Sequence, residues 1–315
     1  MIPIFVGGCV RSGTTMLGAI LGKADRSIVW PENYIKNALI STTDLDIGAT
    51  LEAIRSHFKF YHLGISDEEL DILLREKEYE FASLTGKLWR IVTKYARIEG
   101  NDQPLDFLVD HMPSNIYTAP LLLKHYPKAK FIHIIRDGRA VANSVMKLDW
   151  GPNDPIEAAD LWIRSVGQGL AAQITIPSEQ FITVSYEDLV TNPEREVQKI
   201  CQFTGQRFDS SMLEGTSTFI HSYTQKQHKL VGKRPQGNRL QAWKKELGAK
   251  DIKIFEKRAY WMLTNLGYGD LSISANGGSS DLDISMKDKF QYFFLGKMKS
   301  HGVNKVRWRK RPTSK

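Results

Sequence analysis

The stretch Gly8-Cys9-Val10-Arg11-Ser12-Gly13-Thr14-Thr15 decides the fold of this 315-residue chain. It follows a short apolar run at residues 4–6, and it precedes a helical face formed by Leu17, Ile20 and Leu21. A glycine-rich turn between a strand and a helix directs backbone N–H groups and the positive helix end toward an anion. The sequence therefore predicts an anion-binding turn of the phosphate-loop type.

This loop departs from the ATP-binding form at one position. Gly8 and Gly13 have the spacing of that form, in which a lysine follows the second glycine. Thr14 takes the place of the lysine, and the cation Arg11 lies inside the loop instead. Such a loop suits a terminal anion but lacks the lysine used in Mg²⁺-assisted phosphoryl transfer. An ordinary βα turn would explain the glycines alone, whereas Arg11 and the Ser-Gly-Thr-Thr run favour an anion site.

Four more short apolar runs predict a parallel sheet. They are rich in β-branched and aromatic residues and do not alternate with polar ones, as in strands covered on both faces. They lie at residues 27–30, 107–109, 131–135 and 181–184. Helical patterns separate them, including one that starts at Pro193 after the N-cap Asn192 and one that ends before the C-cap Gly267. We therefore predict a three-layer α/β/α fold with a central parallel sheet.

The predicted organisation is one α/β domain over residues 1–270. Residues 34–103 separate the second and third strands and are expected to form a largely helical insertion on the acceptor side of the crevice. Residues 271–286, which contain an Asn-Gly-Gly-Ser-Ser run, are expected to be a linker. Residues 287–315 are expected to be a basic C-terminal tail with an aromatic cluster.

The net charge of +8 comes from this tail. Residues 287–315 hold ten Lys or Arg and one acidic residue, whereas the other 286 residues hold 33 basic and 34 acidic side chains. The charge of the whole chain is therefore poor evidence for a nucleic-acid partner, and we expect none. Two interpretations of the tail stay open: a weak contact with an anionic membrane surface, or a terminal helix packed on the domain with a basic end.

The remaining composition is that of an ordinary globular protein. The two cysteines, Cys9 and Cys201, do not form a disulfide framework. Residues 1–6 lead directly into the loop without room for a signal peptide, and no run reaches the roughly 18 apolar residues of a membrane span. We therefore expect a cytoplasmic protein. The histidines lack zinc-like spacing, so we expect no metal site, and the oligomeric state stays open.

A second anion site is predicted after the fourth strand. Each apolar run leads into a polar cluster, and the carboxyl ends of parallel strands meet at one edge of the sheet. Arg136 leaves the fourth strand, and Ser144 lies eight residues on, roughly two turns along a helix. A guanidinium and a hydroxyl suit a separate phosphate, although a surface pair with a helix-capping Asp137 explains the arginine alone. Together with the first loop, the pair favours a ligand with two phosphates.

At this point the sequence resembles the sulfotransferase family. The resemblance rests on residues 10–15, on Arg136 with Ser144, and on Tyr186-Glu187-Asp188-Leu189, and it extends from about residue 4 to 269. It is nearest in style to the bacterial and tyrosylprotein branches. It implies in-line transfer of a sulfuryl group from 3′-phosphoadenosine 5′-phosphosulfate to a hydroxyl of a carbohydrate, lipid, small molecule or tyrosine, without a metal. A nucleotide-dependent kinase and a non-catalytic anion-binding protein with this fold are the alternatives.

The resemblance also assigns nucleotide-binding residues. The 5′-phosphosulfate would be held by Arg11, Ser12, Gly13, Thr14 and Thr15. The 3′-phosphate would be held by Arg136 and Ser144, and Tyr186 would contact the nucleotide near the fifth strand. A late basic loop before Trp243 adds Lys229, Lys233 and Arg234, for which a solvated basic loop is the simpler interpretation. The product would be adenosine 3′,5′-bisphosphate.

Three residues are catalytic candidates by the same resemblance. Glu32 follows the second strand where tyrosylprotein sulfotransferases carry their base, and a carboxylate there can accept the hydroxyl proton. His111 lies two residues before Pro113, where many relatives have a lysine, but cytosolic sulfotransferases place a base histidine in a similar arrangement. The base therefore stays open between Glu32 and His111. If Glu32 is the base, His111 stabilises charge on the leaving phosphate, together with Arg11.

Overall fold

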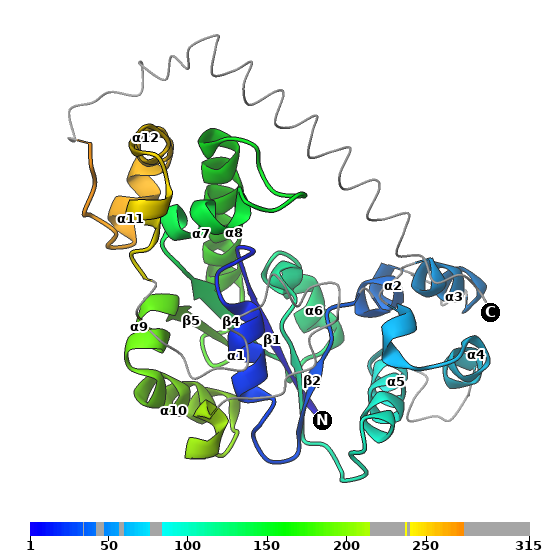
Figure 1. The fold of residues 1–315 in the computed structure, drawn as a ribbon. Coiled ribbons are helices and arrows are strands. Elements are labelled where there is room, and N and C mark those ends of the chain that lie inside the picture. The colour runs from blue at the N-terminus through cyan, green and yellow to red at the C-terminus, as the bar shows by residue number, and fades with distance from the viewer. Residues whose placement is uncertain are drawn as a thin grey trace.

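The computed structural model describes residues 1–33, 35–41, 47–56, 60–75, 84–214, 237 and 240–273. Five strands form one sheet at the centre of the molecule (Figure 1): β1 (Ile2–Gly8), β2 (Ser27–Trp30), β3 (Phe107–Asp110), β4 (Lys130–Ile135) and β5 (Phe181–Ser185). Their order is β2-β3-β1-β4-β5, and every neighbouring pair is parallel. The predicted strands and their parallel arrangement are confirmed. β1 is longer than predicted because its pairing with β4 continues through Gly7 and Gly8.

Helices cover both faces of the sheet, which gives the predicted three layers. Successive strand residues point to opposite faces, so Ile4 and Val6 of β1 enter one core cluster and Phe5 enters another. The first cluster is closed by α1 (Thr14–Leu21), α9 (Tyr186–Thr191), α10 (Pro193–Thr204) and η4 (Ser210–Leu213). The second is closed by α6 (Ala119–His125) and by the end of α8 (Pro155–Thr175).

A third cluster supports the loops beyond β1 and β4. It packs α7 (Gly138–Val145) and α8 against α12 (Ala249–Asn265), with the short α11 (Trp243–Glu246) beside α7. Trp162 lies at its centre, with its ring centroid 6.1 Å from that of Phe255. The predicted start of one helix and the predicted end of another are confirmed. α10 begins at Pro193 after Asn192, and a left-handed Gly267 follows the end of α12.

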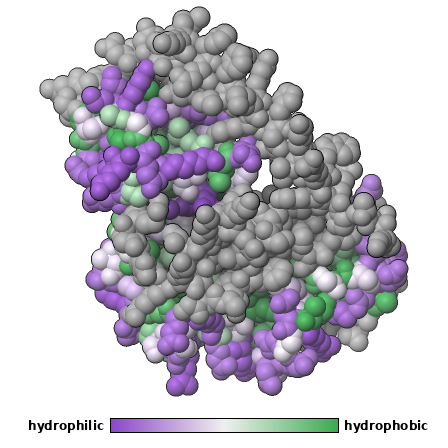
Figure 2. All heavy atoms as spheres, in the orientation of Figure 1, coloured by the Kyte–Doolittle hydropathy of each residue, from purple (hydrophilic) through white to green (hydrophobic). Residues whose placement is uncertain are grey.

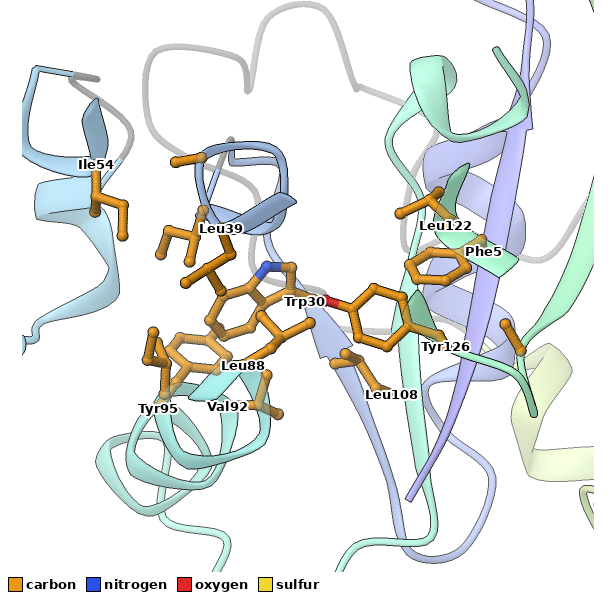
Figure 3. Close-up of a cluster of buried hydrophobic side chains, with 14 of the residues drawn as sticks. Phe5, Trp30, Leu39, Ile54, Leu88, Val92, Tyr95, Leu108, Leu122 and Tyr126 are labelled. Atoms are coloured by element: carbon orange, nitrogen blue, oxygen red, sulfur yellow. The ribbon is translucent and has the colours of Figure 1, made fainter. Parts of the chain in front are cut away.

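The insertion packs on the β2 edge of the sheet. Its described helices are α2 (Ile35–Ser41), α3 (Ile47–Arg55), η1 (Phe60–Leu63), α4 (Asp67–Arg75) and α5 (Leu84–Ile98), which group together in Figure 1. Figure 3 shows Trp30 of β2 between Leu88, Val92 and Tyr95 of α5 and the ring of Tyr126. The Trp30 and Tyr95 rings meet edge to face at 5.4 Å. The helical character predicted for the insertion is thus confirmed where the structure describes it.

The chain outside these elements carries several open predictions. The domain limits, and the expectation that residues 34–103 shape the acceptor side, stay predictions. Apart from residues 271–273, the predicted linker and the basic tail lie outside the described residues. On the face drawn in Figure 2, the described residues at the surface are mostly hydrophilic, and hydrophobic ones lie in separated groups. Among the described helices, none combines the length and apolar character needed to cross a membrane.

A buried histidine in β4 makes the stability of the fold sensitive to acid. His133 is fully buried beside Gly169 of α8, and neither ring nitrogen has a hydrogen-bond partner among the described residues. Burial lowers the pKa of His133 from 6.5 to about 4. His133 therefore binds a proton below pH 6.5 in the unfolded chain, but only below about pH 4 in the folded chain.

We therefore expect His133 to lower the free energy of unfolding by about 2 kcal/mol between pH 7 and pH 5. Its contribution is fully present above pH 6.5 and is lost as the pH falls toward 4. Urea unfolding of the wild type and of His133→Leu at both pH values measures the effect, because the variant lacks this part of the pH dependence. An equal pH dependence in the two proteins would contradict the assignment.

Candidate active site

The loop after β1 is shaped for an anion by its backbone. Gly8 and Gly13 have φ angles of 153° and 100°, and a side chain at Gly8 would lie 2.4 Å from the Ile134 carbonyl oxygen. Gly13 is the N-cap of α1, and no side chain caps that helix end. The first N–H groups of a helix have no partner within the helix. This end of α1 is therefore available to a negatively charged group.

Arg11 crosses from the loop to the helix after β4. Its φ of 68° is uncommon for a residue with a side chain, and its Nε donates to Ser144 Oγ of α7 at 3.0 Å. Burial and nearby Arg136 lower the pKa of Arg11, while Glu32 acts in the opposite direction. An arginine remains charged under these conditions. Arg11 therefore connects the two predicted phosphate sites, because it belongs to the first and contacts Ser144 of the second.

Arg136, which follows β4, also contacts Arg11. Its Nη1 donates to the Arg11 carbonyl oxygen at 2.9 Å, and its guanidinium lies 4.2 Å from the centre of the Tyr186 ring. That ring packs against Gly13, where an added Cβ would lie 2.7 Å from it. Trp162 Nε1 holds the Arg136 carbonyl at 3.0 Å. The structure thus brings together Arg11, Arg136, Ser144 and Tyr186, as the convergence of strand ends predicts.

Two buried polar atoms in this group lack partners among the described residues: Ser12 Oγ and Arg136 Nε. Ser12 is fully buried, Thr14 is buried, and Thr15 is partly exposed. Buried hydroxyl and guanidinium groups are normally hydrogen-bonded, so these two atoms fit a ligand that brings acceptor oxygens. A phosphate or sulfate group has such oxygens. The residues present therefore fit the predicted nucleotide, with Ser12 toward its phosphosulfate and Arg136 toward its 3′-phosphate.

Glu32 and His111 meet beyond β2 and β3. His111 Nδ1 lies 3.8 Å from Glu32 Oε1, and the side chains are 7% and 29% exposed, respectively. Glu32 also acts electrostatically on Arg11, so the carboxylate lies near both the histidine and the loop cation. The more accessible of the two groups is thus Glu32. The three catalytic candidates occupy one region, although no contact among them assigns the base.

Asn33, the residue that follows Glu32, has a structural role. Its Oδ1 accepts the Ile35 N–H at 3.0 Å, and its Nδ2 donates to the Pro31 carbonyl at 2.6 Å. Asn33 is buried. It thus forms the turn that joins Glu32 to the start of α2.

Sequence reasoning missed Lys36. Its buried Nζ donates at 2.6 Å to Oδ2 of Asp110, the buried carboxylate at the end of β3. A lysine in a short helix of the insertion resembles any surface lysine in sequence, and only the packing of α2 on β3 reveals it. Within the described ranges, no group of three or more His, Cys, Asp or Glu residues is arranged to hold a metal ion.

Two sets of predicted residues have other outcomes. Lys229, Lys233 and Arg234 lie outside the described residues. Asp137 caps α7, as the simpler interpretation of the Arg136 motif proposed, because its carboxylate accepts the Arg139 N–H at 2.9 Å. This cap coexists with the anion site, since the Arg136 side chain points to Arg11 and Tyr186 instead.

The position of His111 depends on a glycine in α1. A Cβ added at Gly18 would lie 2.6 Å from His111 Cβ and 2.8 Å from its ring. We expect Gly18→Ala to displace His111 from Glu32 and to lower kcat about tenfold or more, because misplacement of about 1 Å is costly in an active site. Steady-state kinetics and the melting temperature measure the effect. Gly167→Ala in α8 is the matched control, because an added Cβ meets nothing within 4 Å there; equal kcat values for the two variants would contradict the expectation.

The fold and site together define a class of protein: a parallel α/β protein with a phosphate loop whose cation comes from within the loop. The model of the sulfotransferase family matches residues 3–210. The chain therefore belongs to the sulfotransferase family, and the predicted family is confirmed.

Individual relatives are more distant. The chain is 25% identical over 215 residues to protein-tyrosine sulfotransferase 1 of Danio rerio, a match that covers 67% of this chain and 55% of that protein. It is 22% identical over 215 residues to protein-tyrosine sulfotransferase 2 of Gallus gallus, covering 67% and 53%. The chain thus spans about half the length of these curated relatives. The sulfotransferase domain from the curacin biosynthetic pathway has a similar fold, with a TM-score of 0.52, 16% identity, and coverage of 84% of this chain and 96% of that one.

Proposed function

We propose that this protein transfers a sulfuryl group from 3′-phosphoadenosine 5′-phosphosulfate to an acceptor hydroxyl. The observation that carries the proposal is the position of Arg11. It joins the phosphate loop to Ser144 and Arg136, and the carboxylate of Glu32 is near enough to act on its pKa. Family membership supports the same reaction. When bound, the nucleotide would supply the sulfuryl group in an activated mixed anhydride.

The residues of this chain divide the work of binding. The loop N–H groups, Arg11 and Ser12 would hold the 5′-phosphosulfate, because they form the end of α1 that favours negative charge. Arg136 and Ser144 would hold the 3′-phosphate, and Tyr186 supports the Arg136 guanidinium by stacking. Because the two sites meet at Arg11, they would hold both phosphate groups of the nucleotide without the lysine of an ATP loop.

Glu32 is the base in this proposal. It is the more exposed member of the Glu32–His111 pair and therefore the more accessible to an acceptor. Its carboxylate takes the acceptor proton while the acceptor oxygen forms a bond to sulfur and the bond from sulfur to the leaving phosphate oxygen breaks. Arg11 and His111 stabilise the negative charge that develops on that phosphate. The products are the sulfated acceptor, adenosine 3′,5′-bisphosphate and a proton on Glu32, which passes to solvent.

The phenolic hydroxyl of a tyrosine is the first acceptor to test, because two relatives are named for tyrosine sulfation. Carbohydrate, lipid and small-molecule hydroxyls belong to the same proposal, since the insertion helices offer no motif that selects among them.

Thermal stabilisation separates this function from its alternatives. A ligand that binds only the folded state raises the melting temperature. We expect adenosine 3′,5′-bisphosphate at about 100 times its Kd to stabilise the protein by about 2.7 kcal/mol without added metal, and to do so more than Mg²⁺-ATP at the same concentration. Stabilisation by Mg²⁺-ATP alone would favour a kinase, and no response to either nucleotide would favour a fold retained for another role. Either result would remove the proposed function.

A further inference from the structure

A buried ion pair lies next to the two candidate catalytic groups. Lys36 Nζ donates to Asp110 Oδ2 at 2.6 Å, and the side chains are 1% and 2% exposed. Lys36 belongs to α2 of the insertion, whereas Asp110 ends the strand β3 within the sheet. Removal of two charges from water is costly, so such a pair is weak evidence for stability. One attested use of a buried pair is to specify a single arrangement of the elements that it joins.

The Asp110 side of the pair fixes the peptide that carries His111. Asp110 Oδ1 accepts the Met112 N–H at 3.0 Å and Asn115 Nδ2 at 2.9 Å. Asn115 Nδ2 also lies 3.2 Å from the Val6 carbonyl oxygen of β1. Burial alone would raise the pKa of Asp110, but Lys36, Asn115 and the Met112 N–H together lower it below its usual value. The carboxylate is therefore ionised. Its hydrogen bond from the Met112 N–H joins the two residues that flank His111.

The Lys36 side fixes Glu32. Glu32 precedes Lys36 by four residues, and the buried turn made by Asn33 joins the glutamate to the start of α2. Lys36 Nζ also lies 3.6 Å from Met112 Sδ. The helix that follows Glu32 is thus anchored, through one charged contact, to the turn that contains His111. The 3.8 Å separation of Glu32 Oε1 and His111 Nδ1 follows from this connection.

We propose that Lys36 and Asp110 are positioning residues that hold Glu32 and His111 in register for sulfuryl transfer. This inference rests on the proposed function. Among the described residues, the hydrogen bonds and ion pair of Lys36 and Asp110 do not include the phosphate loop, so the pair acts on the rate through Glu32 and His111 and leaves nucleotide binding intact. Because Lys36 comes from the insertion, the same contact also fixes the predicted acceptor side relative to the sheet.

The first test replaces both partners, since a single replacement would leave one buried charge unpaired. For Lys36→Met with Asp110→Asn, we expect kcat to fall about 10- to 100-fold, with the KM for the sulfuryl donor within about threefold of wild type. The matched control is Arg258→Gln with Asp160→Asn, which removes a partly exposed pair between α12 and α8 and should leave kcat unchanged. A wild-type kcat in the folded Lys36→Met, Asp110→Asn protein would overturn the inference.

A second variant covers the case in which the double replacement does not fold. Asn33→Ala releases the turn between Glu32 and α2 without exposing a buried charge, and we expect a similar loss of kcat with nucleotide binding retained. Adding Glu32→Gln to either variant distinguishes positioning from general damage. The two losses should fall well short of additive if the pair acts through Glu32, whereas full additivity would overturn the inference.

A spectroscopic readout separates this inference from the proposed function. The Glu32→Gln substitution should move the NMR resonance of the His111 Cε1 proton in the wild-type background, because the carboxylate lies 3.8 Å from Nδ1. In the Lys36→Met, Asp110→Asn background, the same substitution should move it much less. An equal response in both backgrounds would overturn the positioning role. If the wild type transferred no sulfuryl group, the proposed function would fail, and this comparison would still decide the inference.

Discussion

Glu32→Gln should lower kcat by about 10²- to 10⁴-fold, the range that general acid–base catalysis contributes in enzymes. Glutamine keeps the size of the side chain but cannot accept the proton of the acceptor hydroxyl. The effect should appear in kcat, because Glu32 lies beside the anion site instead of forming it. Steady-state transfer rates and the thermal shift with adenosine 3′,5′-bisphosphate measure the two properties separately.

Two comparisons give this result its meaning. Glu52→Gln, on the exposed face of α3, controls for loss of a carboxylate and should leave kcat unchanged. His111→Ala tests the other candidate, and we expect a smaller loss than in Glu32→Gln because the less exposed His111 stabilises the leaving phosphate instead of accepting the acceptor proton. Full activity in Glu32→Gln, with His111→Ala inactive but folded, would transfer the role of base to His111.

Arg11→Ala is expected to have the second large effect. The guanidinium is the cation of the loop and is the connection to Ser144, so its loss removes charge stabilisation from the leaving phosphate. Loss of one such group typically lowers kcat by about 10²- to 10³-fold, and loss of a charged hydrogen bond weakens binding by about 1.5–3 kcal/mol. Kinetics and calorimetric titration with adenosine 3′,5′-bisphosphate check both parts.

Arg26→Ala provides a close control for this substitution. Arg26 also has a positive φ, 53°, but it is half-exposed, pairs with Asp106 and lies before β2, at the amino end of the parallel strands, whereas Arg11 lies beyond their carboxyl end. It therefore reproduces the backbone strain and the lost charge without touching the site. If Arg11→Ala bound the bisphosphate as tightly as Arg26→Ala, the loop would not be the anion site.

The sheet was predictable because its strands carry a strong local signal. Runs such as residues 131–135 are short, apolar and bounded by polar clusters, and these clusters follow the carboxyl ends of parallel strands. The order of the strands and the docking of α5 on Trp30 required tertiary information, since both depend on contacts between distant segments. The loop was predictable for a local reason as well. Its backbone angles favour glycine at positions 8 and 13, and this glycine spacing is visible in the sequence.

The site was predictable in its members but not in its connections. The sequence placed Arg11 and Arg136 after strands and Ser144 along the helix that follows Arg136, but it treated them as two sites. Their junction depends on the unusual φ of Arg11, which no pattern records. Lys36 carried no signal at all, because a buried ion pair depends on how α2 packs against β3. The ionised state of Asp110 likewise depends on tertiary contacts, because Lys36, Asn115 and the Met112 N–H together lower its pKa.

The most direct test of the central claim is a transfer assay with radiolabelled 3′-phosphoadenosine 5′-phosphosulfate. Wild-type protein and Glu32→Gln are incubated with the donor and a panel of tyrosine peptides, sugars, lipids and small alcohols, without added metal. We predict that wild type moves label to at least one acceptor and releases an equal amount of adenosine 3′,5′-bisphosphate, at a rate about 10²-fold or more above that of Glu32→Gln. Release of the bisphosphate by the wild type no faster than by Glu32→Gln, with both proteins binding the nucleotide, would contradict sulfuryl transfer at this site.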